Sequence, residues 1–265
     1  MRPVSFNIVV QSFYQSLKIQ DVWLGRMACR AMKWRGFSPV AVHPKHLFDE
    51  DRGSMLHELL RPGINFLDLG SGVGSDCIVA KQRGARKVVG VEGSQHNIDK
   101  AVVRAEKAGV QVEFIACDLE QAALPVADNT FDIINFSNVL EHLNNRVAIL
   151  RDLKNKKTAE GLVVISIPNS ETGWKKKLRA AGLDSRDDED HKVEYSEQSI
   201  QEELACADLR ITSKLYPIIP SFPWNGLIAM SAAVSPALYR RLQRAKRRFV
   251  QRNPQESIGW VFIAK

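Results

Sequence analysis

The chain of 265 residues is long enough for one elaborated domain or two small ones. With 45% hydrophobic and 25% charged residues, it has the composition of a globular protein, which excludes a disordered chain. The net charge of +7 is local: from Arg240 onward eight basic residues face one acid, Glu256, whereas residues 1–239 hold 29 basic and 29 acidic side chains. This asymmetry excludes a surface that is basic throughout and indicates one cationic C-terminal segment.

The cysteines and the N-terminal segment indicate a reducing compartment. No two cysteines form a CxxC pair, which argues against a zinc site and against a disulfide framework. The N-terminal segment has neither a long apolar run nor a small-residue cleavage site, so we expect no signal peptide and a cytoplasmic protein.

Residues 1–60 are expected to form a helical segment that helps to select the substrate. Within them, DVWLGRMACRAMKW (21–34) predicts a basic amphipathic helix. We expect it to pack as a lid over the ligand site, with an ordinary surface helix as the alternative. Its predicted apolar face consists of Trp23, Leu24, Met27, Ala28, Ala31 and Trp34.

Residues 61–265 are expected to form the main domain, in which apolar runs of strand length alternate with helical patterns. Continuous apolar runs are typical of strands covered on both faces. The alternation predicts an α/β fold, with a doubly wound, mostly parallel sheet that binds ligands beyond the carboxyl ends of its strands. The predicted strands are 64–70, 86–92, 110–118, 131–138 and 162–169, and the predicted helices are 74–83, 94–108 and 144–157.

The loop FLDLGSGVGSD (66–76) follows the first of these strands. It contains three alternating glycines, which are Gly70, Gly72 and Gly74. A dinucleotide fingerprint needs its third glycine where this chain has Ser75, and a phosphate-binding loop needs a Gly-Lys-Ser/Thr sequence that does not occur here. Asp68 precedes the glycines, and its carboxylate suits a ligand with positive charge, such as an ammonium or a sulfonium.

These motifs resemble those of the class I S-adenosylmethionine-dependent methyltransferases over residues 64–169. The resemblance implies S-adenosyl-L-methionine as cofactor and a Rossmann-like sheet of seven strands, whose antiparallel last strand, SIGWVFIAK, pairs at the sheet edge with LRITSKLYPI. It also implies cofactor roles for residues at successive strand ends. Asp68 and the glycine loop would hold the methionine part, Glu92 in RKVVGVE the ribose hydroxyls, and Asp118 and Leu119 in ACDL the adenine, while the backbone near Phe136 would face the ammonium.

Two histidines are candidate catalytic bases. His191 follows an acidic loop, 187–190, and Asp190 beside it would supply its charge partner. The family resemblance places a similar Asp, His and Tyr cluster along the acceptor pocket, before a helix that Ser196 would cap; the alternative is that His191 only anchors the loop.

The second histidine is His142 in NVLEHL. Asn138, Glu141 and His142 are spaced to share one helical face, and we favour a structural or pocket-lining role for His142. Some quinone-biosynthesis relatives use an acid-rich version of this segment for a divalent metal. Because Asn138 stands at its first position here, we expect no metal.

The segment 170–250 is expected to contain the acceptor-pocket insertions. Residues 215–239 carry no charge, and four prolines within them forbid a regular membrane-spanning helix. This stretch predicts either a buried pocket, which needs no second partner, or a surface that rests on the membrane while the arginines meet lipid phosphates.

The expected function is methyl transfer to an oxygen or nitrogen of a small molecule, a sugar or a lipid-linked glycan, because the segments after residue 165 are similar to those of methyltransferases of bacterial surface glycans. An RNA methyltransferase that uses residues 240–248 is an alternative, although the chain has no Asn-Pro-Pro-Tyr or Pro-Cys motif, so we expect no nucleic-acid partner. A non-catalytic cofactor-binding protein is the other alternative.

Overall fold

The computed structural model describes residues 27, 30–34, 50–121, 123–215, 224–257 and 259–265. The chain divides into two compact units. The first, which we call the sheet unit, comprises residues 53–169, 187–215 and 259–265. The second, the helical unit, comprises residues 1–52, 170–186 and 216–258.

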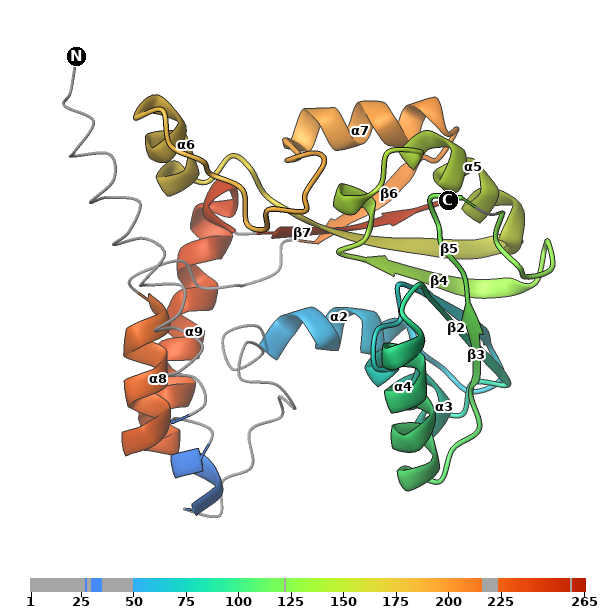
Figure 1. The fold of residues 1–265 in the computed structure, drawn as a ribbon. Helices are drawn as coiled ribbons and strands as arrows, with labels where there is room; N and C mark the ends of the chain where they lie inside the picture. The colour runs from blue at the N-terminus through green and yellow to red at the C-terminus, as the bar shows by residue number, and fades with distance from the viewer. Residues whose placement is uncertain (1–26, 28–29, 35–49, 122, 216–223, 258) are drawn as a thin grey trace. The chain divides into compact units, whose positions relative to one another are not determined.

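The sheet unit contains one seven-stranded sheet in the order β3-β2-β1-β4-β5-β7-β6 (Figure 1). All pairs from β3 to β5 are parallel, and β7 runs antiparallel to both of its neighbours. This confirms the predicted Rossmann-like fold with an antiparallel last strand. The strands are β1 (Asn65–Leu69), β2 (Lys87–Glu92), β3 (Glu113–Ala116), β4 (Phe131–Ser137), β5 (Lys157–Pro168), β6 (Ile211–Leu215) and β7 (Gly259–Ala264).

Helices cover both faces of this sheet, as the apolar strands require. In Figure 1, α5 (Arg146–Lys156) and α7 (Glu197–Cys206) lie on one face, and α3 (Ser75–Gln82) and α4 (Gln95–Lys107) lie on the other. Leu56 of α2 (Glu50–Leu59) packs into the same core cluster as Phe66 of β1 and Cys77 of α3.

The predicted antiparallel pairing of the last strand is confirmed, because β7 pairs with β6, which forms the edge of the sheet. Two details of the sheet unit differ from the sequence predictions. β3 begins three residues later than predicted, because the amide of Val110 still bonds to the carbonyl of Ala105 and closes α4. α5 begins at Arg146, two residues later than predicted, because Asn144 and Asn145 form a bend that follows the short 3-10 helix η2 (Leu140–His142).

Asn138 does not share a helical face with Glu141 and His142, and that prediction is wrong. Its φ of +53° is in the left-handed region, outside any helix, and its amide bonds to the carbonyl of Ser166 on the neighbouring strand β5. Asparagine tolerates this conformation better than most residues do.

The helical unit contains α6 (Gly173–Ala180), α8 (Trp224–Val234), α9 (Pro236–Arg252) and η3 (Pro254–Glu256). α8 ends immediately before Ser235, whose side chain caps α9, and Pro236 occupies the first turn of α9, where a proline costs no hydrogen bond. No helix within the described ranges combines the length and the hydrophobicity that a membrane crossing needs.

The predicted lid falls largely outside the described residues. Its described part is helical over residues 30–34. Met32 is fully buried there, whereas Met27 and Trp34, which belong to the predicted apolar face, are 48% and 86% exposed. The buried face of this short helix is therefore centred on Met32.

Candidate active site

The glycine loop between β1 and α3 adopts a conformation that other residues strain to reach. Gly70, Gly72 and Gly74 all have positive φ angles, of 67°, 53° and 74°. A Cβ atom on Gly70 would overlap Cγ2 of Val139, and one on Gly74 would lie 2.7 Å from Cζ of Phe114. Around Gly72, by contrast, a Cβ would meet nothing within 4 Å. The loop therefore packs tightly on both sides and is open at its centre, which leaves backbone accessible to a ligand.

Asp68 lies near the carboxyl end of β1 and is only 4% exposed. Asn135 Nδ2 donates to Asp68 Oδ1 at 2.8 Å, and the Cys77 thiol donates to Asp68 Oδ2 at 3.5 Å. Burial raises the pKa of Asp68 to about 8, and the negative charges of Asp76 and Glu92 add to the rise, although both hydrogen bonds oppose it. A nearby cation would favour the ionised form, so the site is suited to a positively charged group.

Asn135 was not among the residues expected from the sequence. It is 1% exposed, and its Oδ1 accepts a hydrogen bond from the Ser137 hydroxyl at 2.7 Å. The available signal was an amide side chain inside the apolar run FDIINFS, because a buried amide must find hydrogen-bond partners.

Glu92, at the end of β2, connects the glycine loop to the start of α4. Its Oε2 accepts from the amide of Gly72 at 2.8 Å, and its Oε1 accepts from the amide of Ser94 at 3.0 Å and from Asn97 Nδ2 at 3.3 Å. Two carboxylate oxygens offer about four lone-pair positions, so Glu92 retains acceptor capacity for a ligand.

Asp118 and Leu119 follow β3. Asp118 is exposed, and its Oδ1 accepts from the amide of Glu120 at 2.9 Å. Leu119 is 7% exposed, and its carbonyl accepts from Asn145 Nδ2 at 2.7 Å.

The three acids Asp68, Glu92 and Asp118 stand at or just beyond the carboxyl ends of β1, β2 and β3, which are neighbours in the sheet. Adjacent strands lie about 4.8 Å apart, so the acids form a row along this edge. Phe136 of β4, which pairs with Leu69 of β1, is fully buried beside them. The fold thus assembles at one edge the residues that the sequence motifs singled out.

The two candidate histidines meet although they are far apart in the sequence. His142 belongs to η2 and His191 follows the acidic loop, and their rings contact edge to face with centroids 4.7 Å apart. Val139, whose side chain packs against Gly70, begins the same turn as His142. The histidine pair is thereby connected to the glycine loop through one short segment.

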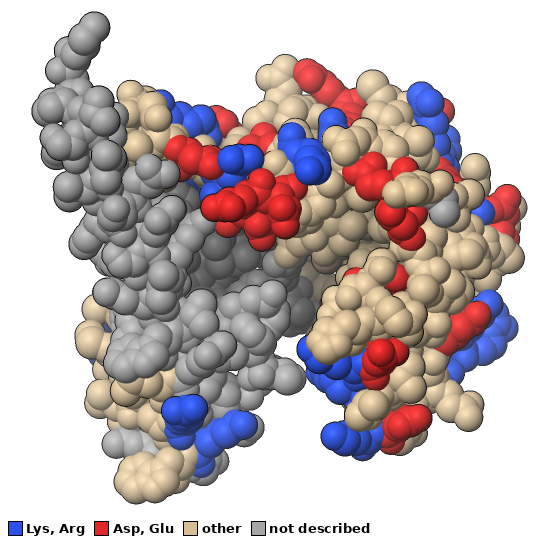
Figure 2. All heavy atoms as spheres, in the orientation of Figure 1, with Lys and Arg blue, Asp and Glu red and all other residues tan. Residues whose placement is uncertain are grey.

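The carboxylate partner of His191 is Glu194 and not Asp190 as predicted. His191 Nδ1 lies 2.6 Å from Glu194 Oε1, and the His191 side chain is 5% exposed. The amide of His191 contacts the carbonyl of Asp188 at 3.4 Å, so the chain turns here and brings the residue three positions later alongside the ring. Asp190 is exposed. Figure 2 shows a cluster of acidic side chains on the face that it draws.

Glu141 completes the cluster. Its side chain is fully buried, and its carbonyl accepts from the amide of Lys192 at 2.8 Å, which holds the His191 segment against η2. The ligand atoms of Glu141, His142 and His191 lie within 4.8 Å of one another, so these three side chains could hold a metal ion, which the sequence did not predict.

Tyr195, which belongs to the expected Asp, His and Tyr cluster, makes contacts that indicate a structural role. Its hydroxyl donates to Glu203 Oε2 at 2.9 Å, and Glu203 Oε1 accepts from Arg146 Nε at 2.7 Å. Burial raises the pKa of Tyr195 far above its usual range. The predicted cap of α7 is confirmed, because Ser196 and Ser199 form a capping box at its start.

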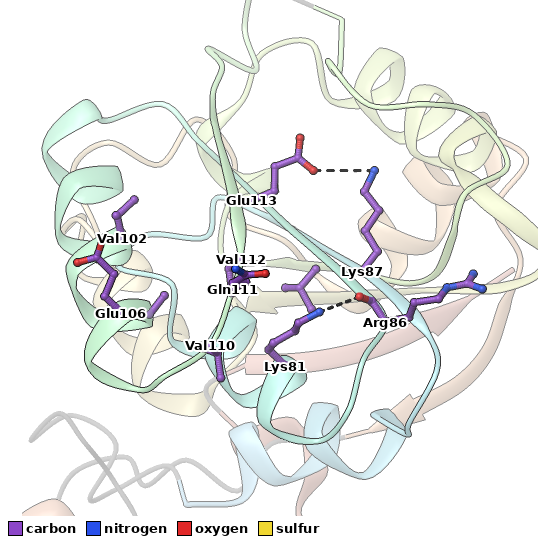
Figure 3. Close-up of a pocket in the computed structure, with 11 residues that line it drawn as sticks. Lys81, Arg86, Lys87, Val102, Glu106, Val110, Gln111, Val112 and Glu113 are labelled. Atoms are coloured by element: carbon purple, nitrogen blue, oxygen red, sulfur yellow. Dashed lines mark hydrogen bonds and ion pairs between the residues drawn. The ribbon is translucent and has the colours of Figure 1, made fainter.

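A shallow depression lies at the opposite edge of the sheet, where β2 and β3 begin (Figure 3). Lys87 and Glu113, the first residues of these strands, line it and form an ion pair at 3.9 Å. Its described lining includes none of the motif residues, so it is not the candidate site.

Comparisons with known proteins agree with this geometry. A family model described as a methyltransferase domain matches residues 60–219. The chain belongs to this methyltransferase family. The predictions of a class I methyltransferase domain and of S-adenosyl-L-methionine as its cofactor are thereby confirmed.

Among curated relatives, the ubiquinone biosynthesis O-methyltransferase of Parvibaculum lavamentivorans is 29% identical over 160 residues, which cover 55% of this chain and 61% of that protein. The ribosomal protein L11 methyltransferase of Thermosipho melanesiensis is 33% identical over 113 residues, 43% of this chain and 41% of that protein. The chain thus spans less than two thirds of the length of these relatives. The solved S-adenosylmethionine-dependent methyltransferase of Mesorhizobium loti shares the fold, with a TM-score of 0.53, 18% identity, and coverage of 80% of this chain and 95% of that one.

Proposed function

We propose that the protein transfers the methyl group of S-adenosyl-L-methionine to an oxygen or nitrogen atom of a small molecule, a sugar or a lipid-linked glycan. The observation that carries this proposal is the buried His191, which is held by Glu194 at 2.6 Å and is connected to the glycine loop through η2. The proposal places the reaction in the cytoplasm, with the helical unit reaching the inner face of the membrane.

The acids and glycines at the carboxyl edge would hold the cofactor. Asp68 and the open centre of the glycine loop would bind its methionine part, and Glu92 would accept hydrogen bonds from both ribose hydroxyls. Asp118 and the amide of Leu119 would bind the adenine, while the backbone at Phe136 would face the ammonium. The fit is supported by the buried carboxyl of Asp68, since a cationic ligand compensates the cost of ionising it.

Methyl transfer to a hydroxyl or an ammonium requires the loss of a proton. When bound, the cofactor supplies a methyl group already activated by its sulfonium, so the protein has to align the acceptor in line with it and exclude water. His191 would accept the acceptor's proton at Nε2 while Glu194 holds Nδ1–H and fixes the orientation of the ring. His142, edge-on to His191, would line the acceptor pocket.

The acceptor class follows from this base. A hydroxyl or ammonium acceptor must lose a proton, and a base beside it can take that proton. The Parvibaculum relative is by name an O-methyltransferase of ubiquinone biosynthesis. An RNA acceptor would be favoured by the exposed arginines of α9, but these belong to the helical unit and not to the unit that carries the histidine pair.

Transfer of radiolabelled methyl groups into fractionated cells tests the proposal. We expect label in the glycan, lipid or small-molecule fractions. His191→Ala should lower kcat by about 10² to 10⁴, the usual contribution of a general base, with S-adenosylhomocysteine binding unchanged.

Glu194→Gln is the test of the positioning role, since it removes the charge but keeps the size of the side chain. We expect an intermediate loss in kcat and no change in KM for S-adenosyl-L-methionine. Tyr195→Phe is the matched control in the same segment, and its kcat should remain that of the unaltered enzyme. Label found only in RNA or protein would overturn the acceptor class, and cofactor binding without transfer to any fraction would support a non-catalytic protein.

A further inference from the structure

Helix α8 of the helical unit carries an exposed apolar row. Leu227, Met230 and Val234 are 43%, 58% and 60% exposed, and their spacing of three and four residues puts them on one face. The helix contains no charged residue. Surface apolar side chains are ordinary when they are scattered, but a contiguous row on an uncharged helix is typical of a surface that meets an apolar partner.

Helix α9, which contacts α8, carries a cationic row. Its buried face consists of Tyr239, Lys246 and Val250. Roughly opposite this face, at the same helical spacing as the row on α8, lie the exposed Arg241, Arg244 and Arg248, which with Arg247 line one shallow depression. The two exposed apolar side chains of α9 are Leu238, which precedes these arginines in the sequence, and Phe249, which follows them; they are 42% and 37% exposed.

The sequence around both helices contains no acidic residue. None occurs between Asp208 and Glu256, while α9 alone contains seven arginines and lysines. Val234 ends the row of α8 and Leu238 begins the exposed face of α9, with only three residues between them. The hairpin thus joins an uncharged apolar row to a purely cationic one.

We propose that the α8–α9 hairpin rests on the surface of a membrane that contains anionic phospholipids. The apolar row of α8 would enter the boundary between headgroups and acyl chains, and the arginine row of α9 would bind lipid phosphates. The hairpin lies on the membrane and does not cross it, since α8 has 11 residues and spans about 16 Å, roughly half of a hydrocarbon core. RNA would explain the arginines but not the exposed Leu227, Met230 and Val234.

This inference concerns the helical unit alone, so it stands or falls separately from the proposed methyl transfer. It also favours lipid-linked acceptors in that proposal. A protein bound to the membrane surface shares this surface with lipid-linked acceptors and encounters them by diffusion in two dimensions. The exposed row of α8 is one face of the uncharged stretch, for which the sequence left a buried pocket and a membrane-resting surface open.

Vesicle flotation of the full chain tests the inference. We expect the protein to float with phosphatidylcholine vesicles that contain one third phosphatidylglycerol, and much less with phosphatidylcholine alone. Each arginine near such a surface contributes about fivefold to binding, so the triple variant Arg241→Gln, Arg244→Gln, Arg248→Gln should bind about a hundredfold more weakly. The variant Arg61→Gln, Lys100→Gln, Lys107→Gln, which removes three exposed charges from the sheet unit, is the matched control and should bind normally.

A second variant tests the apolar row. Leu227→Gln with Met230→Gln should weaken binding at high salt as well as at low salt, whereas the effect of the arginine variant should shrink as salt screens it. Circular dichroism and S-adenosylhomocysteine binding show that each variant is folded.

Absence of flotation with anionic vesicles, or equal flotation of the arginine triple variant, would overturn the inference. Salt-sensitive binding of structured RNA that the triple variant loses, without vesicle binding, would assign the arginines to nucleic acid. Vesicle binding in a protein that binds no S-adenosylhomocysteine would contradict the methyltransferase proposal and leave this one intact.

Discussion

Replacing Asp68 by asparagine should stabilise the cofactor-free protein and weaken its cofactor binding at the same time. Burial raises the pKa of this carboxyl from 3.8 to about 8, so the folded protein keeps the proton at pH values where the unfolded chain has released it. The stability that the protonated carboxyl contributes is therefore complete below pH 3.8 and is lost progressively as the pH rises to about 8. Asparagine has no such titration, and its amide can still accept the hydrogen bond from Asn135.

The size of the effect follows from linkage. Between the two pKa values the free energy of unfolding falls by about 1.4 kcal/mol per pH unit because of this single group. From about pH 5.5 to about pH 7.5, Asp68→Asn should therefore gain about 2 to 3 kcal/mol relative to the unaltered protein. Urea denaturation at a series of pH values measures this directly, with Asp99→Asn, an exposed acid on α4, as the control whose curve should run parallel to that of the unaltered protein.

Binding should change in the opposite direction. Only the ionised carboxyl attracts a cationic amino group, so affinity for S-adenosylhomocysteine should rise about tenfold per pH unit below pH 8 and should lose that dependence in Asp68→Asn. The reasoning is refuted if the difference in unfolding free energy between variant and unaltered protein is the same at both pH values, because Asp68 would then be ionised in the free protein throughout.

Three further predictions concern the same unit. Gly70→Ala should weaken cofactor binding and destabilise the fold by more than Gly109→Ala, since both glycines have a φ of +67° but only an alanine at Gly70 meets Val139; urea denaturation of both variants would show equal losses if the packing did not matter. Tyr195→Phe should cost about 1 to 2 kcal/mol of stability through the lost hydrogen bond to Glu203, and a fall in kcat without a fall in stability would contradict its structural role. Dialysis against a chelator should leave methyl transfer unchanged, because the proposed base needs an open ring nitrogen; loss of activity that zinc or magnesium restores would identify the histidine cluster as a metal centre.

The sheet and the row of acids along its carboxyl edge could be predicted because their signals are local. Continuous apolar runs identify buried parallel strands, and a run of alternating glycines after such a strand identifies the loop. The acids Asp68, Glu92 and Asp118 each lie close to the carboxyl end of a strand, and parallel strands bring these ends to one edge, so their row follows from topology alone.

The histidine cluster could be predicted only in part because its contacts depend on the path of loops. His142 and His191 are 49 positions apart, and no periodicity relates them. The choice of Glu194 over the adjacent Asp190 depends on a single turn at Asp188, which reverses the direction in which the following side chains point. Adjacency in sequence was a poor guide here because neighbouring side chains in an extended or turning segment diverge.

The prolines around α8 limit the length of a helix without preventing one. They exclude a regular membrane-spanning helix over residues 215–239, yet residues 224–235 contain no proline, and this interval is long enough for three turns of helix. Pro236 then begins the next helix instead of breaking one.

The three acids at the carboxyl edge, which we propose bind the cofactor, differ in how deeply they are buried. Asp68 is nearly inaccessible, Glu92 is partly buried and bonded to the loop, and Asp118 is exposed. An electrostatic interaction strengthens as water is excluded, so the charge of the ligand should be sensed mainly at Asp68, next to the segment that leads to His142. Discrimination by charge is thus concentrated at the end of the site where the proposed chemistry takes place, while the exposed end at Asp118 can contribute only hydrogen bonds and shape.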